Sequence, residues 1–390
     1  MADIGFKGLE IWKAEFPFRL RFSHNLADRR SGETILVFIA SDRGTLGCGQ
    51  ALPRSYLTGE SLESVVEDIS KHWWPKLAAL RLPCSKDIGE ALERLAPWYE
   101  EADALRHLSA YSALEMAVMD GYGREQGIPA RLPRELSHSK IPLVGVIPAV
   151  GANKAVWMAR ILSWLGYRRF KVKVGHDANA DMRRLAAVRK VIGSDAWLAV
   201  DANAAWTSSD AGERMAGLRH YNVSVVEEPL QRDKSTPEQL AALEADSGIP
   251  VMADESLCTF ADAQALLAAG GPSWWNLRFA KNGGFLGLSR LSSLAKENSI
   301  TVYQGILVGE TSVLAAAARG TMSGVAPLCA EYGFPRIFIK GDPFRGGPGG
   351  FHGTMETVGD ATPGLGIHPI RRLLEDKASP VWTGGDKVWM

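Results

Sequence analysis

The sequence has few of the features that mark secreted, zinc-knuckle or membrane proteins. Its 390 residues include only four cysteines, which are scattered and form no C-x-x-C pair: Cys48, Cys84, Cys258 and Cys329. This spacing argues against a zinc knuckle or a disulfide framework, so we expect reduced thiols in a cytoplasmic protein. No apolar run reaches the roughly 18 residues that a membrane helix needs. The first residues also lack the basic-then-apolar pattern of a signal peptide.

The sequence also lacks an excess of either charge. It carries 44 basic and 44 acidic side chains, whose formal charges cancel at pH 7. A protein without net charge has no strong overall electrostatic field, so it has little attraction for nucleic acid or an anionic membrane. Its hydrophobic content of 46% is that of an ordinary globular protein. We therefore expect a small-molecule partner, no nucleic acid and no membrane, in a homo-oligomer of the kind common among enzymes of this size.

The spacing of apolar residues divides the chain into regions. Residues 1 to about 60 read as strands and turns, and the next segment, up to Gly127, follows the helical period. From IPLVGVIPAV to VAPLCAEYG, strand-like and helix-like segments then alternate, with eight strands in all. Alternating units of this number predict a parallel (β/α)8 barrel of the TIM type, preceded by an α+β head.

One polar residue lies at or near the C-terminal end of each successive predicted strand. The series is Lys173, Asp201, Glu227, Asp254, Arg278, Gln304 and Glu331. The differences between successive numbers run from 24 to 28, about one βα unit each. The C-terminal ends of barrel strands meet at one rim, where barrel enzymes build their active sites. A single such charge is more often a solvated loop residue, but the ordered series predicts one shared site.

The segment FKVKVG places two lysines on one face of a strand. Side chains alternate along a strand, so Lys171 and Lys173 point the same way and the valines beside them point the other way. Two ammonium groups in a barrel mouth need carboxylates or a bound anion to offset their desolvation. The acids of the next three strands supply this charge, and their oxygens suit Mg²⁺ or Mn²⁺. We predict that the metal holds a substrate carboxylate whose α-proton a lysine removes.

Five segments resemble, in order and spacing, the signatures of the enolase superfamily, and specifically of its muconate-lactonizing (muconate cycloisomerase) subgroup. They are FKVKVG, LAVDANAAW, VVEEPL, VMADES and LRFAKNGG. In the head, GCGQALPRSYLTGES looks like the family's G-x-G-E-x-x-P segment. The histidine chemistry of the mandelate racemase branch is disfavoured because no His–Asp dyad follows the seventh predicted strand.

The resemblance implies a modified barrel whose eighth helix is replaced, covered by an α+β capping domain. We assign residues 1–130 to the capping domain, 131–345 to the barrel, and 346–390 to a C-terminal segment that returns to the capping domain. In this family, mobile loops of the capping domain close over the site. We place these loops around Arg19 to Arg30 and around Ser55 to Thr58.

The resemblance also implies roles for individual residues. The Mg²⁺ ligands would be Asp201, Glu227 and Asp254, with Glu227 chosen over Glu228 by the resemblance alone. Lys173 matches the catalytic lysine of the K-x-K motif, and Lys171 matches its enolate-stabilising companion. Further candidates for supporting or substrate contacts are Asn203, Glu255, Lys281, Glu310, Glu331 and Tyr56.

The sequence departs from the family pattern at Arg278, where the muconate-lactonizing, succinylbenzoate-synthase and dipeptide-epimerase branches carry a lysine. A guanidinium group stays protonated at neutral pH, so it is a poor base but a good clamp for a carboxylate. Lys281, three residues on, should face away from the site unless the strand has already ended. We therefore predict that Lys173, as acid and base, serves only one face of the α-carbon, which we call one-face chemistry. The reaction would be either a cycloisomerisation or a syn elimination such as dehydration.

Other functions remain open on the sequence. A racemase or epimerase of an amino-acid derivative or hydroxy acid would need a second proton donor, such as Arg278 or Glu310. More distantly, Lys173 would act as the Schiff-base lysine of an aldolase. The change at Arg278 is also compatible with a protein that binds a carboxylate without turning it over. Of these functions, the sequence favours an isomerase or a lyase that acts on a carboxylate.

Overall fold

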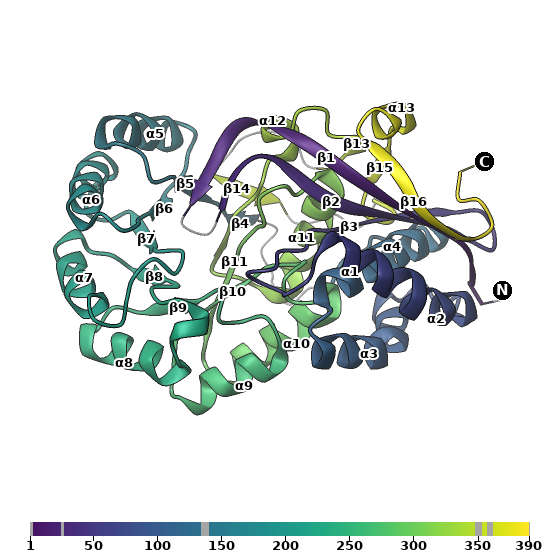
Figure 1. Ribbon diagram of the computed structural model, residues 1–390, viewed down its shortest axis with the longest axis horizontal. Coiled ribbons are helices and arrows are strands. Elements are labelled where there is room, and N and C mark those ends of the chain that lie inside the picture. Colours follow the sequence, from purple (N-terminus) through teal and green to yellow (C-terminus); the bar gives the residue numbers. More distant parts are fainter. Residues whose placement is uncertain (1–2, 25–26, 134–139, 348–352, 357–361, 390) are drawn as a thin grey trace.

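The computed structural model describes residues 3–24, 27–133, 140–347, 353–356 and 362–389 (Figure 1). Figure 1 shows helices α5 to α10 around the outside of the central strands, with the N-terminal strands and β16 together on one side. No helix among the described residues is long and apolar enough to cross a membrane. None of the four cysteines, all of which lie in the described ranges, forms a disulfide.

The capping domain combines an antiparallel sheet with helices. Its four strands lie in the order β16-β1-β2-β3. They are β1 (Phe6–His24), β2 (Ala27–Ser41), β3 (Leu46–Ala51) and β16 (Ala378–Gly385). The helices are α1 (Leu62–Glu67), the π-helix Asp68–Trp73, α2 (Trp74–Ala79), α3 (Ile88–Leu105) and α4 (Leu108–Gln126). Because β16 pairs with β1, the C-terminal tail returns to the N-terminal region, as the resemblance implied.

Glycines let β3 pack directly onto α4. Gly47 and Gly49 are two residues apart and so lie on the same face of the strand. A Cβ atom on Gly49 would overlap the backbone carbonyl oxygen of Ala113, and one on Gly47 would overlap that of Ala117. The GCG pattern of the sequence is therefore explained by the close approach of strand and helix backbones.

The barrel contains eight parallel strands that are neighbours in sequence order. They are β5 (Val144–Ile147), β6 (Arg169–Lys173), β7 (Trp197–Asp201), β8 (Val225–Glu227), β9 (Val251–Ala253), β10 (Trp274–Leu277), β11 (Thr301–Gln304) and β12 (Cys329–Ala330). A parallel bridge between Leu143 and Ala330 brings the first and last strands together. The predicted α/β fold, a modified (β/α)8 barrel with a capping domain, is confirmed.

A helix follows each strand of the barrel. The long ones are α5 (Ala152–Trp164), α6 (Ala178–Ile192), α7 (Ala211–Leu218), α8 (Pro237–Ser247), α9 (Phe260–Ala268), α10 (Gly284–Glu297) and α11 (Ser312–Val325). After β12 the chain forms only the four-residue α12 (Pro335–Phe338). The eighth helix is thus reduced to a single turn, in line with the modified barrel that the resemblance implied.

Short elements complete the chain. They are the 3-10 turns Arg219–Tyr221 and Arg232–Lys234, β4 (Lys140–Pro142) paired with β14 (Thr354–Glu356), β13 (Phe344–Gly346) paired with β15 (Ile367–Pro369), and α13 (Arg371–Glu375). The loop predicted around Arg19 to Arg30 is instead mostly strand, because β1 runs to His24 and β2 begins at Ala27. Residues 25 and 26 lie outside the described ranges.

An apolar cluster fills the inside of the barrel at the end where the strands begin. Its buried members are Val144, Ala199, Val225, Met252, Tyr303 and Cys329. Trp197 and Trp274, the first residues of β7 and β10, stack with their ring centroids 5.9 Å apart. This apolar cluster occupies one end of the barrel. Polar side chains lie at the opposite end, where the strands finish.

Candidate active site

The predicted polar series lies at the ends of the strands, as expected. Lys173, Asp201, Glu227 and Gln304 are the last residues of their strands, and Asp254, Arg278 and Glu331 follow theirs directly. Gln304 does not belong to the shared site, so that prediction is wrong. Its amide donates to the carbonyl of Ala318 at 2.6 Å and to the hydroxyl of Thr321 at 3.0 Å, both on α11. Alternation along β11 turns Tyr303 into the barrel and Gln304 toward the helices.

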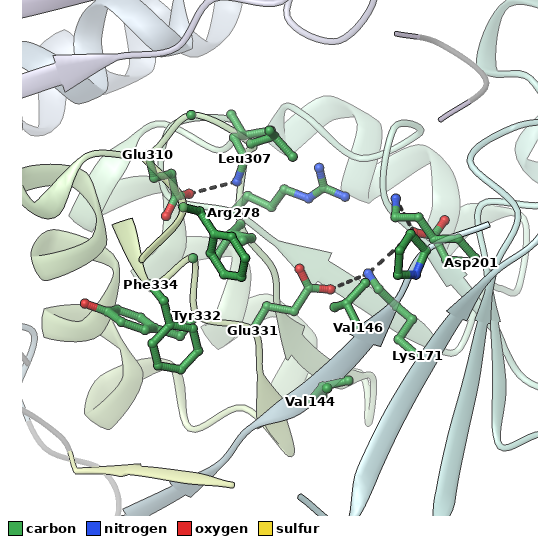
Figure 2. Close-up of a pocket in the computed structure, with 18 of the residues that line it drawn as sticks. Val144, Val146, Lys171, Asp201, Arg278, Leu307, Glu310, Glu331, Tyr332 and Phe334 are labelled. Atoms are coloured by element: carbon green, nitrogen blue, oxygen red, sulfur yellow. Dashed lines mark hydrogen bonds and ion pairs between the residues drawn. The ribbon is translucent and has the colours of Figure 1, made fainter. Parts of the chain in front are cut away.

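Lys171 is fully enclosed by acids. Its Nζ lies 2.7 Å from Glu227 Oε2. It also lies 3.6 Å from Asp201 Oδ2 and pairs with Glu331 (Figure 2). Burial lowers the pKa of Lys171, but the Glu227, Glu331 and Asp201 carboxylates outweigh burial and raise it well above the ordinary value. Lys171 therefore stays positively charged, which suits a group that stabilises negative charge and not one that accepts a proton.

Lys173 is more open than its neighbour. Its side chain is 22% exposed, and its Nζ donates to Asn203 Oδ1 at 2.6 Å and lies 3.1 Å from Asp201 Oδ2. Burial raises the pKa of Asp201, but the charges of Lys173 and Lys171 outweigh it and hold that pKa below its ordinary range. Both lysines of the K-x-K segment thus point into the barrel mouth, and Lys173 is the one whose side chain reaches open space.

Arg278 bridges two of the predicted metal ligands. Its Nη2 lies 3.4 Å from Glu227 Oε1 and also contacts Asp254 Oδ2. The other Asp254 oxygen accepts from Lys281 Nζ at 2.9 Å. Strand β10 ends at Leu277, so Lys281 does not face away from the site but turns back toward the same acid. Burial and the Arg278 charge lower the pKa of Lys281 to about 7.

The glutamate pair of VVEEPL separates into two roles. Glu227 faces Lys171 and Arg278, whereas Glu228 accepts from the backbone N–H groups of Asp254 at 2.7 Å and Ser256 at 3.1 Å. Glu228 has a φ of +36°, which turns the chain at the end of β8. Burial raises its pKa to about 7. Glu228 therefore holds the loop that carries Asp254, and Glu227 is the acid available to a cation.

Cations of the protein itself pair with all three predicted metal ligands. Among the described residues, no group of three or more histidine, cysteine, aspartate or glutamate side chains is arranged to hold a metal ion. Asp201 and Glu227 are nevertheless direct partners in the register of β7 and β8, and Glu227 and Asp254 share one nitrogen of Arg278. Three carboxylates on adjacent strands fit Mg²⁺ chemically.

A cavity of about 420 Å³ opens above these groups (Figure 2). The predicted site residues that line it are Lys171, Lys173, Asp201, Asn203, Glu255, Arg278, Glu310, Glu331 and, from the capping domain, Tyr56. Glu227, Asp254 and Lys281 are buried behind this surface. Burial raises the pKa values of Glu255 and Glu310 to about 8.

Two site residues were not predicted from the sequence. Asn276 donates to Glu227 Oε1 at 2.8 Å, and the Tyr303 hydroxyl donates to Glu331 Oε1 at 2.7 Å. The Tyr303 ring also lies 5.2 Å from Lys171 Nζ. Asn276 is two residues before Arg278, so strand alternation alone was a usable signal for it. Tyr303 gave no such signal because aromatic residues in strands are usually core residues.

Comparison with known proteins places these features in a family. The family model described as Enolase C-terminal domain-like matches residues 155–373. A hydrophobic dipeptide epimerase from Enterococcus faecalis is 26% identical, with 86% of this chain and 93% of the relative covered. Muconate cycloisomerase 1 from Pseudomonas putida is 27% identical, with 76% of this chain and 79% of the relative covered.

Solved structures share the same fold. The crystal structure of an N-succinyl Arg/Lys racemase from Bacillus cereus matches with a TM-score of 0.83 and 22% identity, covering 98% of this chain and all of that chain. A dipeptide epimerase from Enterococcus faecalis, complexed with Mg and L-Leu-L-Tyr, matches with a TM-score of 0.78 and 24% identity, covering 93% of this chain and 99% of that one. With the family model matching more than half of its length, the chain belongs to the enolase superfamily.

Proposed function

We propose that this protein removes the α-proton of a small carboxylate substrate, with Lys173 as the acid and base on one face of the α-carbon. Three acids, Asp201, Glu227 and Asp254, would hold Mg²⁺. When bound, the ion would supply a Lewis acid that draws electron density from the substrate carboxylate. Loss of the α-proton converts the substrate carboxylate into an enediolate. From this species the protein would act as a cycloisomerase, or as a lyase that eliminates a leaving group from the same face.

The difference between the two lysines of β6 carries this proposal. Lys173 reaches the cavity and is held by the Asn203 amide and the Asp201 carboxylate. Lys171 is enclosed by carboxylates that raise its pKa and favour its charged form, so it would stabilise negative charge that develops on the substrate carboxylate. The proton taken by Lys173 is available for return to the substrate or to a leaving group on the same face.

Arg278 supports the one-face reaction. It lines the cavity at the end of β10, where the family branches that use two lysines place the second one. A guanidinium group is a very weak base, so Arg278 is not suited to accept a proton from the opposite face. It is suited to gripping a carboxylate through paired hydrogen bonds.

A racemase or epimerase is the second candidate. The relatives named above include a dipeptide epimerase, and the fold matches an N-succinyl Arg/Lys racemase. Inversion would require a proton donor opposite Lys173. Glu310 lines the cavity beyond Arg278, and with a pKa of about 8 its carboxyl group holds a proton at neutral pH. Glu310 would then supply the proton that returns to the second face.

Solvent exchange tests the proposal. The protein, with Mg²⁺, is incubated in deuterium oxide with single enantiomers of N-acylamino acids and hydroxy acids, and separately with unsaturated diacids. NMR follows the α-proton signal of the chiral acids and the products formed from the diacids. One-face chemistry predicts deuterium incorporation with retention of configuration, or formation of a cyclised or dehydrated product. Rapid incorporation with inversion would instead support the racemase or epimerase.

Substitution of Lys173 supplies the matching prediction. Lys173→Met removes the acid and base, and we expect the exchange rate to fall by about 10²-fold to 10⁴-fold, the usual contribution of such a group. Lys190→Met, on the exposed side of α6, is the control and should exchange as the wild type does. If Lys173→Met exchanged at the wild-type rate, Lys173 would not be the base.

A further inference from the structure

The cavity has an apolar end that the proposed proton transfer does not use. Its wall comes from β5, α5 and the segments after β11 and β12, and includes Val146, Met158, Ile161, Leu307, Tyr332 and Phe334. Gly145 allows α5 to approach, because a Cβ atom there would lie 2.9 Å from Leu162 Cδ1. An apolar wall of this kind gains free energy by covering an apolar part of a ligand.

Glu310 is the acidic group at this end. In Figure 2 it lies on the opposite side of Arg278 from Lys171 and Asp201, near Leu307. The Glu310 residue is only 4% exposed, and one oxygen accepts from the Leu307 backbone N–H at 2.8 Å. The other oxygen, Oε2, is buried and has no hydrogen-bond partner among the described residues. A buried polar atom without a partner costs free energy, so a ligand that pairs with Oε2 is favoured.

The remaining carboxylates of the cavity are already engaged or lie elsewhere. Glu331 pairs with Lys171 and accepts from the Tyr303 hydroxyl. Glu255 also has an unpartnered oxygen, but its charged neighbours, which include Lys281, lie at the predicted metal-binding end. Glu310 is thus the carboxyl group positioned to contact the distal part of a substrate.

The surroundings of Glu310 favour its neutral, hydrogen-bond-donating form. Burial raises its pKa to about 8, and the Arg278 charge lowers the pKa only in part. A substrate ammonium group at this end would lose its water among apolar side chains, with the Arg278 guanidinium facing the same cavity. A second substrate carboxylate would likewise lose its water beside the apolar wall, while the Arg278 charge is engaged by the first carboxylate of the substrate. An uncharged acceptor, such as a carbonyl oxygen, meets neither penalty.

We infer that Glu310 selects the substrate by donating a hydrogen bond to an uncharged acceptor on its apolar part. The inference rests on the proposed function for the other end of the substrate, where Lys171, Lys173 and Arg278 receive the carboxylate. The substrate class is then a monocarboxylic acid whose aryl or alkyl substituent carries a ketone, ester or amide carbonyl. Dicarboxylic acids and acids with a distal ammonium group are disfavoured.

Binding of four matched acids tests this inference without requiring turnover. They are phenylacetates with different para substituents of similar shape: acetyl, isopropyl, carboxylate and amidinium. Affinities are measured by calorimetry on the full chain with Mg²⁺. We expect the acetyl compound to bind about tenfold tighter than the isopropyl compound, the usual worth of one hydrogen bond in a buried site. We expect both charged compounds to bind more weakly than the acetyl compound.

Two variants of Glu310 separate a neutral donor from a charged acid. Glu310→Gln keeps an uncharged donor and an acceptor for Leu307, so we expect it to keep the preference for the acetyl compound. Glu310→Leu removes the donor, and we expect the acetyl and isopropyl compounds to bind equally. Circular dichroism and the melting temperature of each variant check that the fold is intact, and the exposed Glu238→Gln on α8 is the control.

Three results would overturn the inference. One is equal binding of the acetyl and isopropyl compounds by the wild type. Another is tightest binding of the amidinium compound with loss of that preference in Glu310→Gln, which would mean that Glu310 is ionised. The third is failure of all four acids to bind. Absence of solvent exchange together with the expected order of affinities would count only against the proposed proton transfer, so the two failures are distinguishable.

Discussion

Arg278 stands where two acids of the predicted metal site meet. Its guanidinium group contacts both Glu227 and Asp254 and separates them from the cavity that it lines. Two buried carboxylates repel one another and are costly to desolvate, so they need a cation between them. The protein supplies that cation from its own chain. We expect Mg²⁺, bound as proposed, to compete with Arg278 for these two carboxylates.

Substitution of Arg278 by methionine tests this competition. Without metal, Arg278→Met leaves Glu227 and Asp254 buried without their shared cation, and we expect the free energy of unfolding to fall by about 3 kcal/mol. We also expect Mg²⁺ to bind more tightly to the variant and to restore much of the lost stability, because no guanidinium group has to leave. Urea unfolding with and without Mg²⁺, and calorimetric titration of Mg²⁺, measure the two effects.

An exposed ion pair supplies the control for Arg278. Lys71 and Glu67 pair at 2.7 Å on the surface, with both side chains more than half exposed. Lys71→Met should cost no more than about 0.5 kcal/mol and leave Mg²⁺ affinity unchanged. Weaker Mg²⁺ binding by Arg278→Met would show that the arginine supports the metal site and does not compete with it.

At the scale of single elements, the length and register of the strands decide which side chains meet. Asp201 pairs with Glu227 in the register of β7 and β8, so the two acids lie side by side. Their one-per-unit spacing in the sequence was enough to predict this. The same spacing wrongly included Gln304, because period-two alternation is only visible once the bounds of β11 are known. For Lys281, the direction of the side chain could not be predicted without knowing where β10 ends.

The contact of β3 with α4 yields a prediction at this scale. Gly49→Ala would place a methyl group against the Ala113 carbonyl oxygen, inside contact distance. The strand and helix backbones would have to separate, and we expect a loss of about 1–3 kcal/mol in the free energy of unfolding. Gly212→Ala is the matched control, because a Cβ atom there meets nothing within 4 Å in the exposed first turn of α7. It should stabilise the protein slightly, by about 0.5–1 kcal/mol. Equal stabilities would mean that the strand is free to shift.

At the scale of the whole molecule, buried polar groups join the capping domain to the barrel. Glu115, on α4, accepts from the backbone N–H groups of Phe285 at 2.5 Å and Leu286 at 3.1 Å, at the start of α10. Gln50, on β3, accepts from the Thr311 N–H at 2.9 Å, just before α11. These contacts join α4 to the start of α10 and β3 to the residue before α11.

Glu115 makes the stability of the molecule depend on pH. Burial raises its pKa from 4.5 to about 8, although three hydrogen bonds oppose the shift. Between these two values the folded state holds a proton that the unfolded state has released, so stability falls as pH rises through this range. The slope is at most about 1.4 kcal/mol per pH unit. We expect urea unfolding to give a lower free energy at pH 8.5 than at pH 6, and a smaller difference for Glu115→Gln. A wild-type free energy of unfolding that rises from pH 6 to pH 8.5 would contradict the prediction. Glu238→Gln is the control and should show the same pH dependence as the wild type.

The sequence by itself determined the order of the elements and the identity of most of the site. Alternating apolar segments predicted the barrel, and one polar residue per βα unit predicted Lys173, Asp201, Glu227, Asp254, Arg278 and Glu331, because these signals are periodic and local. Short motifs were enough for the family, which the matched family model bears out.

Only the tertiary structure decided which groups pair. Arg278 lies between Glu227 and Asp254, Lys281 turns back to Asp254, and Glu310 keeps one oxygen without a partner among the described residues. These outcomes depend on where each strand stops and on which side chains share a buried volume. Such relations join residues far apart in the chain, and no local pattern encodes them. The electrostatic free energies of the site depend on those same distances and on burial, so they too were set by the folded arrangement.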